Sequence, residues 1–299
     1  MNVFLTGATG LIGRALVPGL LARGHAVTAL TRSAAPRLAP AVKVLQGDPA
    51  AAGPWQDALA ACDACIHLAG EPVAGSRWSD ARKRAIRESR VASTARVAEV
   101  IAAGGPEVLL SGSAIGFYGS RQGEVLDETS PPGKGFLSDV CVEWEAAARP
   151  AEARARVVLL RTGMVLAREG GALPQMLLPF KLFAGGPIGS GDFWQAWIHL
   201  ADEVGLVLWA LENGAVKGPL NVTAPAPALQ RDLAKGIGRA LHRPSAIPVP
   251  LLALELLLGE LASVVVASQR VVPRKAQDLG YPFRFPALQG ALDDLLGRR

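Results

Sequence analysis

The chain has 299 residues, 50% of them hydrophobic, and its 31 basic and 26 acidic side chains give a formal net charge of +5. The cations are scattered and form no basic stripe interleaved with aromatic residues, which argues against a nucleic-acid-binding protein. The three cysteines are odd in number and an apolar strand begins near residue 2. We therefore expect a cytoplasmic protein without a disulfide framework or a leader segment.

Residues 2–33 are predicted to form a strand, a glycine-rich turn, a helix and a second strand. The apolar run at residues 3–5 has no polar face, which is typical of a parallel strand buried on both sides. Gly7, Gly10 and Gly13 follow it at spacings of three. Such a turn lets the backbone approach a pyrophosphate, which the free N–H groups at the start of the helix can bind. The pattern predicts an α/β fold, a Rossmann-like doubly wound parallel sheet with a dinucleotide site; a purely structural glycine turn is the alternative.

The end of the second predicted strand distinguishes between the two nicotinamide dinucleotides. Enzymes that bind NAD commonly place an acid there for the ribose 2′-hydroxyl, whereas an arginine accommodates the 2′-phosphate of NADP. This chain has Thr31 and Arg32 at that point, and the next acid is Asp48. We expect NADP(H) rather than NAD(H); the alternative is that Arg32 is an ordinary solvated cation.

Strands and helices continue to alternate along the first half of the chain. Apolar runs predict further strands at 42–46, 64–68, 108–111 and 157–161, and the segments between them predict helices at 55–61, 79–103 and 137–149. Strand ends on one side of a doubly wound sheet line the cofactor crevice. The residues expected there after the fourth, fifth and sixth strands are Leu68, Ala69, Gly70, Glu71, Ser111 and Met164.

The composition changes after residue 166. Residues 170–192 are rich in glycine and proline and carry few charges, which suits a substrate-side loop. A helix to about residue 212 and a short strand at 219–222 follow, and the remainder is expected to be mostly helical. We therefore expect an NADP-binding Rossmann domain at 1–166, to which 194–222 returns, and a smaller, mostly helical substrate region formed by 167–193 and 223–299.

The most apolar stretch, residues 247–267, raises the question of a membrane. Glu255 and Glu260 lie within it, and an acid near the bilayer centre costs about 2.5–3.5 kcal/mol on an insertion scale. Prolines open the stretch and Gly259 interrupts it. A buried helix is expected, and no membrane partner.

Cysteine and metal chemistry are not expected. Cys62 and Cys65 are spaced like a redox pair, but Cys65 lies in the fourth predicted strand and is expected to be a small buried core residue. No paired metal ligands occur at recognisable spacing, so no metal site is predicted.

Longer motifs resemble those of the short-chain dehydrogenase/reductase superfamily in its extended, epimerase/dehydratase-like form. Residues 6–13 (TGATGLIG) resemble its glycine motif, residues 67–70 (HLAG) its second cofactor motif, and residues 117–119 (FYG) its segment after strand five. Over nearly its whole length the chain is similar to an atypical branch of NAD-dependent epimerase/dehydratase-like proteins, the family 39U type, oxidoreductases of unknown substrate. Motifs such as SGSAIGFYG and GGPIGSGDFWQAWIH carry this likeness.

The resemblance implies particular contacts with NADP. Arg90 occupies a position where extended members usually carry an asparagine, and a solvated charge on a basic helix face is its alternative role. Besides the three glycines, the residues that the resemblance places at the cofactor are Thr9, Leu11, Ile12, Thr31, Arg32, Leu68, Ala69 and Arg90.

The superfamily's usual catalytic pair, Tyr-x-x-x-Lys, is missing. The chain has two tyrosines, Tyr118 and Tyr281, and neither has a lysine four residues later. Cys141 stands about where the lysine should be. The resemblance therefore supports the cofactor site but not the usual acid/base chemistry.

Other side chains are candidates for the missing chemistry. Ser113 and Tyr118 could donate hydrogen bonds to a substrate carbonyl, and Glu71 could accept a proton if burial raised its pKa. His199 is a further candidate acid/base, although it has no partner visible in the sequence. Structural roles are the alternative for each: a half-buried aromatic residue with a satisfied hydroxyl for Tyr118, a helix or loop cap for Glu71 and a substrate-domain turn for His199.

Three functions remain open from the sequence. The first is an NADP(H)-dependent oxidoreductase acting on a small carbonyl or hydroxyl substrate of unknown identity. The second is a catalytically silent dinucleotide sensor or scaffold, which the missing pair favours. The third is a nucleotide-sugar epimerase or dehydratase. The sequence does not decide the oligomeric state, and a homodimer is among the candidates.

Overall fold

The structure is a computed structural model that describes residues 1–75 and 77–297. Its centre is a seven-stranded sheet in the order β11-β7-β5-β4-β1-β2-β3, and every pairing in it is parallel. The chain moves outward first from β1 to β3 and then from β4 to β11, which confirms the predicted doubly wound, Rossmann-like fold. The strands are β1 (Asn2–Thr6), β2 (Ala26–Thr31), β3 (Lys43–Gln46), β4 (Ala64–His67), β5 (Val108–Ala114), β7 (Arg156–Thr162) and β11 (Gly218–Val222).

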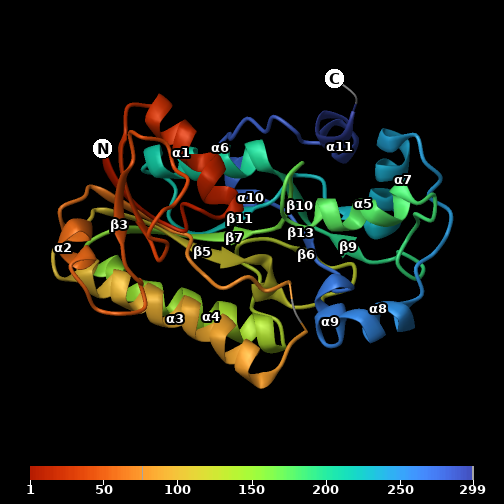
Figure 1. Ribbon diagram of the computed structural model, residues 1–299, viewed down its shortest axis with the longest axis horizontal. Coiled ribbons are helices and arrows are strands. Elements are labelled where there is room, and N and C mark those ends of the chain that lie inside the picture. Colours follow the sequence, from red (N-terminus) through yellow and green to blue (C-terminus); the bar gives the residue numbers. More distant parts are fainter. Residues whose placement is uncertain (76, 298–299) are drawn as a thin grey trace.

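Helices cover both faces of this sheet (Figure 1). Successive side chains of a strand point to opposite faces. Val3 and Leu5 therefore join the apolar core beside α1 and α6, whereas Phe4 joins the core on the opposite face, beside α2 and α3. Burial on both faces explains why β1 has no polar face. The covering helices are α1 (Leu11–Ala22), α2 (Trp55–Ala60), α3 (Asp80–Ala102), α4 (Phe136–Ala148) and α6 (Leu200–Glu212).

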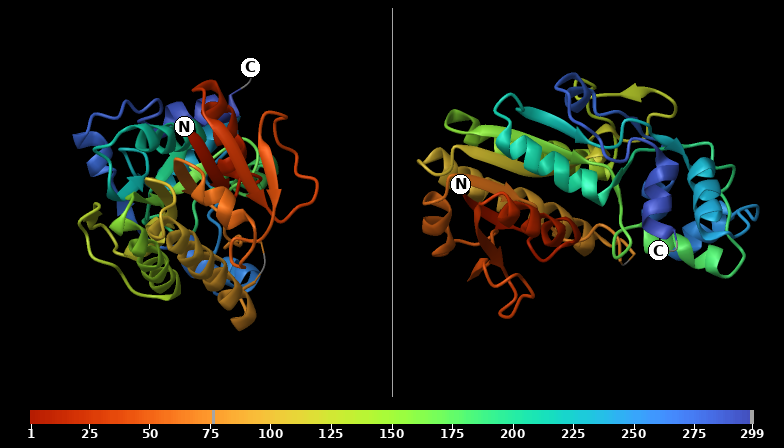
Figure 2. Two further views of the ribbon diagram at one scale, coloured as in Figure 1. Left: turned by 90° about the vertical axis from the view of Figure 1, so that its left-hand side faces the viewer. Right: turned by 90° about the horizontal axis from the view of Figure 1, so that it is seen from above.

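The C-terminal half adds a second group of elements beside the carboxyl ends of the strands (Figure 2). Leu173, Leu233 and Leu292 belong to one core that joins α5, α7 and α11. Three short strand pairs connect this group to the sheet: β8 with β10, β9 with β12, and β6 with β13. The bounds are β6 (Val125–Leu126), β8 (Met164–Leu166), α5 (Leu173–Lys181), β9 (Trp194–Gln195), β10 (Trp197–His199), β12 (Ala228–Leu229), α7 (Gln230–Leu241), α8 (Leu251–Leu258), α9 (Leu261–Val265), β13 (Arg270–Val271), α10 (Arg274–Asp278) and α11 (Leu288–Leu296).

Two sequence predictions in this half are wrong. Residues 170–192 are not only a loop, because they contain α5, which buries Leu173, Leu177 and Phe180. Residues 247–267 are not one buried helix: Gly259, at φ +60°, separates α8 from α9, and no residue of α8 is buried. Within residues 1–75 and 77–297, no helix is both long and apolar enough to cross a membrane.

Arg156, at the start of β7, holds the end of α6 in place. Its guanidinium donates hydrogen bonds of 2.8 Å to the carbonyl oxygens of Ala210, Leu211 and Val216. A cation at a helix C-terminus also interacts favourably with the helix dipole. Since α6 packs against α1, this contact supports the helix that follows the glycine turn.

Replacing Arg156 should therefore lower the stability of the whole fold. We expect Arg156→Met to reduce the free energy of unfolding by about 2 kcal/mol, because three carbonyls lose a charged donor. Urea denaturation followed by tryptophan fluorescence measures this. Arg154→Met, which removes a neighbouring exposed arginine, is the matched control and should leave the midpoint unchanged. Equal effects of the two substitutions would contradict this account.

Candidate functional site

The turn between β1 and α1 is packed so closely that two of its glycines admit no side chain. A Cβ atom on Gly7, which has φ +73°, would lie 2.7 Å from the carbonyl carbon of Leu68. A Cβ atom on Gly13 would lie 2.2 Å from the carbonyl oxygen of Gly7. Gly10 differs: it is exposed, and its Cβ would approach only that same oxygen, at 3.2 Å. Gly7 and Gly13 therefore close the turn, and Gly10 leaves its outer side open.

The N-terminus of α1 is open to an anion. Gly10 is its N-cap in an extended conformation, no side chain caps the helix, and its first turn carries no acid. Thr9 is exposed, and Leu11 and Ile12 are half-buried. The first N–H groups and the positive end of the helix dipole thus face outward, which is the arrangement that suits a phosphate. These residues fit the dinucleotide predicted from the sequence.

A buried hydrogen-bond chain fixes the loop after β4 against this turn. Thr6 Oγ1 accepts hydrogen bonds of 3.1 Å from the backbone N–H groups of Leu68 and Ala69 and lies 2.7 Å from His67 Nδ1. His67 Nε2 lies 3.0 Å from Ser93 Oγ, which itself donates to a backbone carbonyl of α3. This pattern assigns the imidazole proton to Nε2. Burial lowers the pKa of His67 to about 4, so the ring is neutral.

Two arginines meet at Glu71, beside the ends of β2 and β4. Arg32 Nη2 donates to Glu71 Oε1 at 2.9 Å, and Arg82 Nη1 donates to Oε2 at 3.3 Å. The hydrogen bond from Arg32, more than any other contact, holds the pKa of Glu71 below its usual range. The expectation that burial would raise this pKa and make Glu71 a proton acceptor is therefore wrong. Sequence reasoning did not select Arg82, whose position about two turns before Arg90 on the same helix was the available signal.

The remaining predicted cofactor residues lie around the same strand ends. Thr31 is buried, and its hydroxyl accepts from the N–H of Ser33. Arg90 is half-buried rather than solvated: it donates to the carbonyl of Glu71 at 2.9 Å and lies over the ring of Trp144. A Cβ on Gly70 would lie 3.3 Å from the Arg90 guanidinium carbon, so Gly70 lets this arginine reach the loop.

Ser111 and Met164 are less directly placed. Ser111 is fully buried in β5, and its hydroxyl donates weakly to the carbonyl of Gly112 at 3.4 Å. Met164, half-buried at the start of β8, donates its backbone N–H to Ala196. Leu11 contacts Gly170 and Gly171 just beyond β8, so this segment lies beside the start of α1.

The two catalytic candidates belong to a buried polar network. Ser113, 5% exposed, donates to Glu145 Oε1 at 2.7 Å. Tyr118, fully buried, donates to Asn221 Oδ1 at 2.7 Å and accepts from Arg161 at 2.9 Å. Burial raises the pKa of Tyr118 to about 12. Both hydroxyl protons are therefore committed to protein acceptors, which matches the structural alternative.

Glu145 and Arg161 form the centre of that network. Arg161 Nε and Nη2 donate to the two oxygens of Glu145 at 2.7 and 2.8 Å, a bidentate and almost fully buried ion pair. The guanidinium also stacks 3.5 Å from the ring of Phe117. Sequence reasoning missed this pair, although an arginine ending a strand of apolar residues is unusual enough to attract attention. Nearby Cys141 is buried, and its pKa is raised to about 12, so it is a poor substitute for a lysine.

His199 and the cysteines have structural surroundings. His199 caps α6 by accepting from the N–H of Ala201 at 3.0 Å, and its ring stacks on Phe285. Burial lowers the pKa of His199. Cys65 is fully buried, as expected from the sequence, and Cys62 donates to a backbone carbonyl. In the described part of the chain, no three acidic, histidine or cysteine side chains are grouped so as to hold a metal ion.

Two family models match the chain. The model described as "NAD dependent epimerase/dehydratase family" matches residues 3–223 and therefore covers the sheet and the open turn. A second, described as a domain of unknown function (DUF1731), matches residues 249–295, which contain α8 to α11.

Relatives align over almost the whole chain. "Epimerase family protein SDR39U1 homolog, chloroplastic" from Arabidopsis thaliana is 43% identical over 298 residues, which are 98% of this chain and 86% of the relative. "Epimerase family protein YfhF" from Bacillus subtilis is 37% identical over 303 residues, covering 100% and 99%.

Solved structures show the same fold. The crystal structure of human epimerase family protein SDR39U1 (isoform 2) with NADPH has a TM-score of 0.87 at 36% identity and covers 99% of both chains. MoeE5 in complex with UDP-glucuronic acid and NAD has a TM-score of 0.77 at 22% identity, covering 98% and 96%, and shows likeness of fold alone.

The buried His67 predicts a loss of stability in acid. In the unfolded chain this imidazole binds a proton near pH 6.5, whereas in the folded chain it does so only near pH 4. The unfolded state therefore takes up the proton first, and stability should fall by about 3 kcal/mol as the pH decreases from 6.5 to 4. Urea titrations across this range measure the slope. His67→Gln should flatten it and His242→Asn, at an exposed histidine, should not; the same slope in His67→Gln would refute the assignment.

The network predicts a structural effect of removing the Tyr118 hydroxyl. Tyr118→Phe leaves Asn221 without its donor and Arg161 without one acceptor, so we expect a loss of about 1–3 kcal/mol in the free energy of unfolding. Affinity for NADPH should change less than twofold. Thermal denaturation and dinucleotide titration measure the two quantities. Unchanged stability with abolished turnover would instead make Tyr118 a catalytic residue.

Proposed function

The chain belongs to the NAD dependent epimerase/dehydratase family, and from this premise we propose that it binds NADPH and passes hydride between that cofactor and a small carbonyl or hydroxyl substrate. The resemblance to the 39U branch is confirmed by relatives of that name at 36% to 43% identity. The single observation that carries the proposal is the open, uncapped N-terminus of α1 behind a turn that only glycine can form.

The cradle around this turn supports a pyrophosphate at Gly10. The fit rests on three features. The backbone of Gly7 packs against that of Leu68, and the backbone of Gly13 packs against that of Gly7. Gly10 is exposed, and the first turn of α1 contains no acid that would repel an anion. The loop at Leu68–Gly70, held by His67 and Thr6, would run along the rest of the dinucleotide. The human relative, whose crystal structure is with NADPH, supports the same cofactor.

The choice of NADPH over NADH rests on the cations beside β2. The Arg32 side chain is 69% exposed and, with Arg82, already binds an anionic group, the carboxylate of Glu71. Guanidinium groups bind phosphate through charge-assisted hydrogen bonds. An additional phosphate on the ribose would therefore find two donors here in place of Glu71, and residues 31–33 themselves include no acid to accept a 2′-hydroxyl.

The proposed reaction class leaves the proton donor unassigned. NADPH supplies the hydride when it is bound; the chain would hold the substrate beside the carboxyl ends of β5 and β7. We propose residues 1–166 with 194–222 as the cofactor half and residues 167–193 with 223–299 as the substrate half. Cytoplasmic localisation stays a prediction, because a relative carries the word chloroplastic in its name.

A second candidate, dinucleotide binding without turnover, is favoured by one observation. Ser113 and Tyr118 both donate to protein groups, and Tyr118 would lose its proton only near pH 12. A nucleotide-sugar epimerase is the weaker alternative, because the superfamily's Tyr-x-x-x-Lys pair is missing and the sugar-nucleotide complex named above is similar in fold alone.

The oxidation of NADPH in the presence of a panel of small aldehydes and ketones separates the candidates. Substrate-dependent loss of NADPH absorbance is expected for the oxidoreductase. Tight binding of NADPH without turnover of any compound in the panel would instead support a dinucleotide-binding sensor. Gly10→Val protein serves as the blank for contaminating reductases.

Arg32→Asp should weaken the binding of NADPH much more than the binding of NADH. The change removes a phosphate ligand and introduces a charge that repels the 2′-phosphate, so we expect at least a tenfold rise in the dissociation constant of NADPH and a change below threefold for NADH. Fluorescence titration measures both. Arg37→Asp is the matched control at a nearby arginine. An equal loss of affinity for both dinucleotides would contradict the proposal that Arg32 binds the 2′-phosphate.

Gly10→Val should abolish dinucleotide binding while the fold persists. The new side chain would meet only one backbone oxygen of the protein and would occupy the open side of the turn. Circular dichroism and calorimetric titration with NADPH test the two parts. Gly214→Val, in an open surface position, is the control and should bind normally. Unchanged affinity in Gly10→Val would mean that the turn is structural only.

A further inference from the structure

The C-terminal half carries a concentration of exposed apolar side chains. Eight large ones are between 47% and 71% exposed, although a typical monomer scatters such residues singly. We name this set the C-terminal apolar patch. It consists of Leu178, Leu182, Phe183, Ile247, Leu251, Leu252, Leu256 and Leu257.

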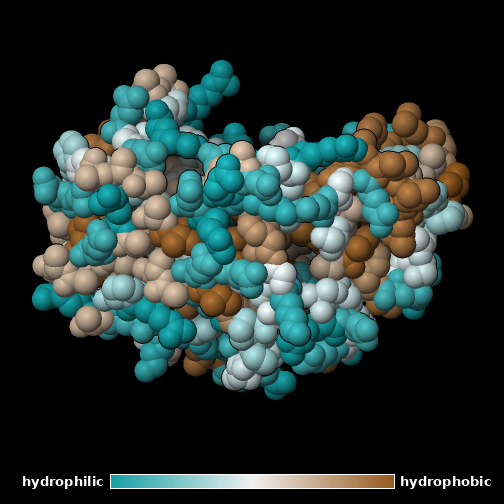
Figure 3. Space-filling view, turned by 90° about the horizontal axis from the view of Figure 1, so that it is seen from below, coloured by the Kyte–Doolittle hydropathy of each residue, from teal (hydrophilic) through white to brown (hydrophobic). Residues whose placement is uncertain are grey.

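Chain segments that lie side by side connect the two ends of this patch. Residues 185–189 run beside residues 247–251: Ile188 forms a parallel bridge with Val249, and Leu251 lies against Gly189. At the other end, the guanidinium of Arg243 covers the ring of Phe183 at 4.3 Å. Figure 3 shows hydrophobic side chains gathered at this end of the molecule. The apolar residues of α5 and α8 therefore belong to one surface.

Helix α8 contacts α9 but buries none of its own residues within the described chain. It is eight residues long, six of them leucine, and none is buried. A helix this short is marginal in water unless an apolar face packs against something. Arg77 binds the carbonyl oxygens of Leu256 and Leu257, so the end of α8 is anchored while its leucines face outward.

The area of the patch matches an interface between two proteins. At the observed fractions, the eight side chains present on the order of 900 Å², compared with about 800 Å² buried by each partner in a standard interface and roughly 300–600 Å² for the largest patch of a typical monomer. A patch of this size suits a stable contact with another folded surface.

The charges around the patch make it complementary to itself. Lys181 and Arg243 lie at the end formed by α5 and α7, and Glu255 lies at the end formed by α8 and α9, where Glu260 is already paired with Lys83. Under a two-fold axis through the middle, the basic end of one copy meets the acidic end of the other. Such an arrangement pairs opposite charges at both rims without needing a different partner.

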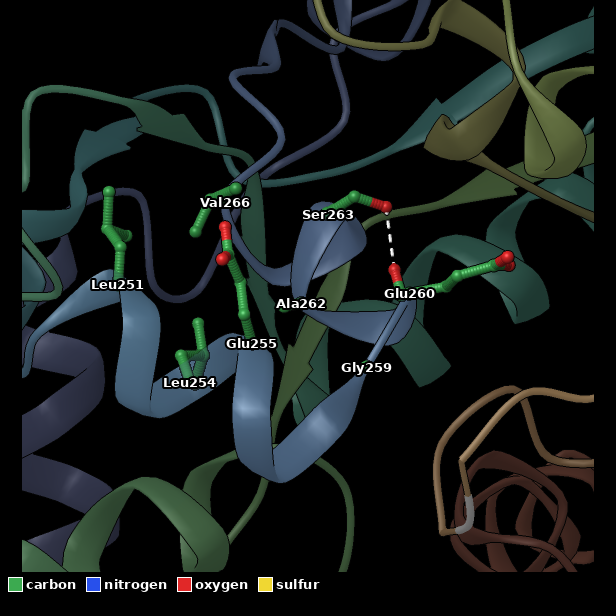
Figure 4. A pocket seen from close by; sticks show the side chains of 8 residues that line it. All are labelled: Leu251, Leu254, Glu255, Gly259, Glu260, Ala262, Ser263 and Val266. Carbon is green, nitrogen blue, oxygen red and sulfur yellow. Dashed lines mark hydrogen bonds between the residues drawn. The ribbon is translucent and has the colours of Figure 1, made fainter.

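The surface contains a recess beside the leucines of α8. It holds about 350 Å³ between α8 and α9 and is lined by Leu251, Leu254 and Val266, and the side chain of Glu255 points in among them (Figure 4). Closely packed interfaces place an apolar side chain of one partner in such a pocket of the other. The exposed leucines of α8 are the side chains available to fill it.

We propose that a second copy of this chain covers the C-terminal apolar patch, in a two-fold contact that packs α8 against its counterpart. The contact buries the leucines of α8 and sets Lys181 of each copy toward Glu255 of the other. This inference does not depend on the proposed oxidoreductase function.

Sedimentation equilibrium of the full chain tests the proposal. The wild type should sediment at twice 31.1 kDa at micromolar concentration, and Leu252→Lys/Leu256→Lys should raise the dimer dissociation constant at least tenfold. Val142→Lys, at an exposed apolar residue on α4 outside the patch, is the matched control and should stay dimeric. Circular dichroism and NADPH titration show that each variant is folded.

A charge exchange tests the two-fold arrangement itself. Lys181→Glu and Glu255→Lys should each weaken the dimer, and the double variant should restore it. A wild type that is monomeric at all concentrations, or a dimer that both sets of changes leave intact, would overturn the proposal. So would a monomer that instead adsorbs to phosphatidylglycerol vesicles, because a membrane would then be the occupant.

Discussion

The site depends on the close contact between the turn after β1 and the loop after β4. Gly7 lies so near the carbonyl of Leu68 that a single methyl group would separate them, and the neutral ring of His67 ties the same loop to Thr6. This contact fixes where α1 begins and which way its first N–H groups point. The open end of α1, where we propose that the pyrophosphate binds, is thus a consequence of packing at Gly7 and Gly13, while Gly10 stays exposed.

A buried ion pair between α4 and β7 organises the polar groups near the carboxyl end of β5. Glu145 and Arg161 neutralise one another and recruit Ser113 and Tyr118 as hydrogen-bond partners. A bidentate, fully satisfied pair of this kind is costly to disturb, since removing one partner leaves an unpaired buried charge. The hydroxyl groups of Ser113 and Tyr118 are therefore already bonded to protein acceptors.

Local patterns in the sequence predicted the sheet, its order of elements and the glycine turn, because burial on both faces leaves a strand with no polar side. The features that the sequence did not predict depend on tertiary packing. Helix α5 contains Pro179, and a proline in the interior of a helix costs about 3 kcal/mol, yet burial of Leu173 and Phe180 stabilises it. Glu145 and Arg161 come from different elements, so their spacing in the sequence does not predict their contact. The apolar composition of α8 likewise did not predict that it lies on the surface.

The most direct measurement is a calorimetric titration of the purified wild-type chain with NADPH and with NADH. The account predicts one site per chain and an affinity for NADPH at least tenfold above that for NADH, since the two ligands differ only in the phosphate that Arg32 is proposed to bind. Equal affinities would contradict the role of the cations beside β2. No binding of either would contradict the central claim that the open end of α1 is a dinucleotide site.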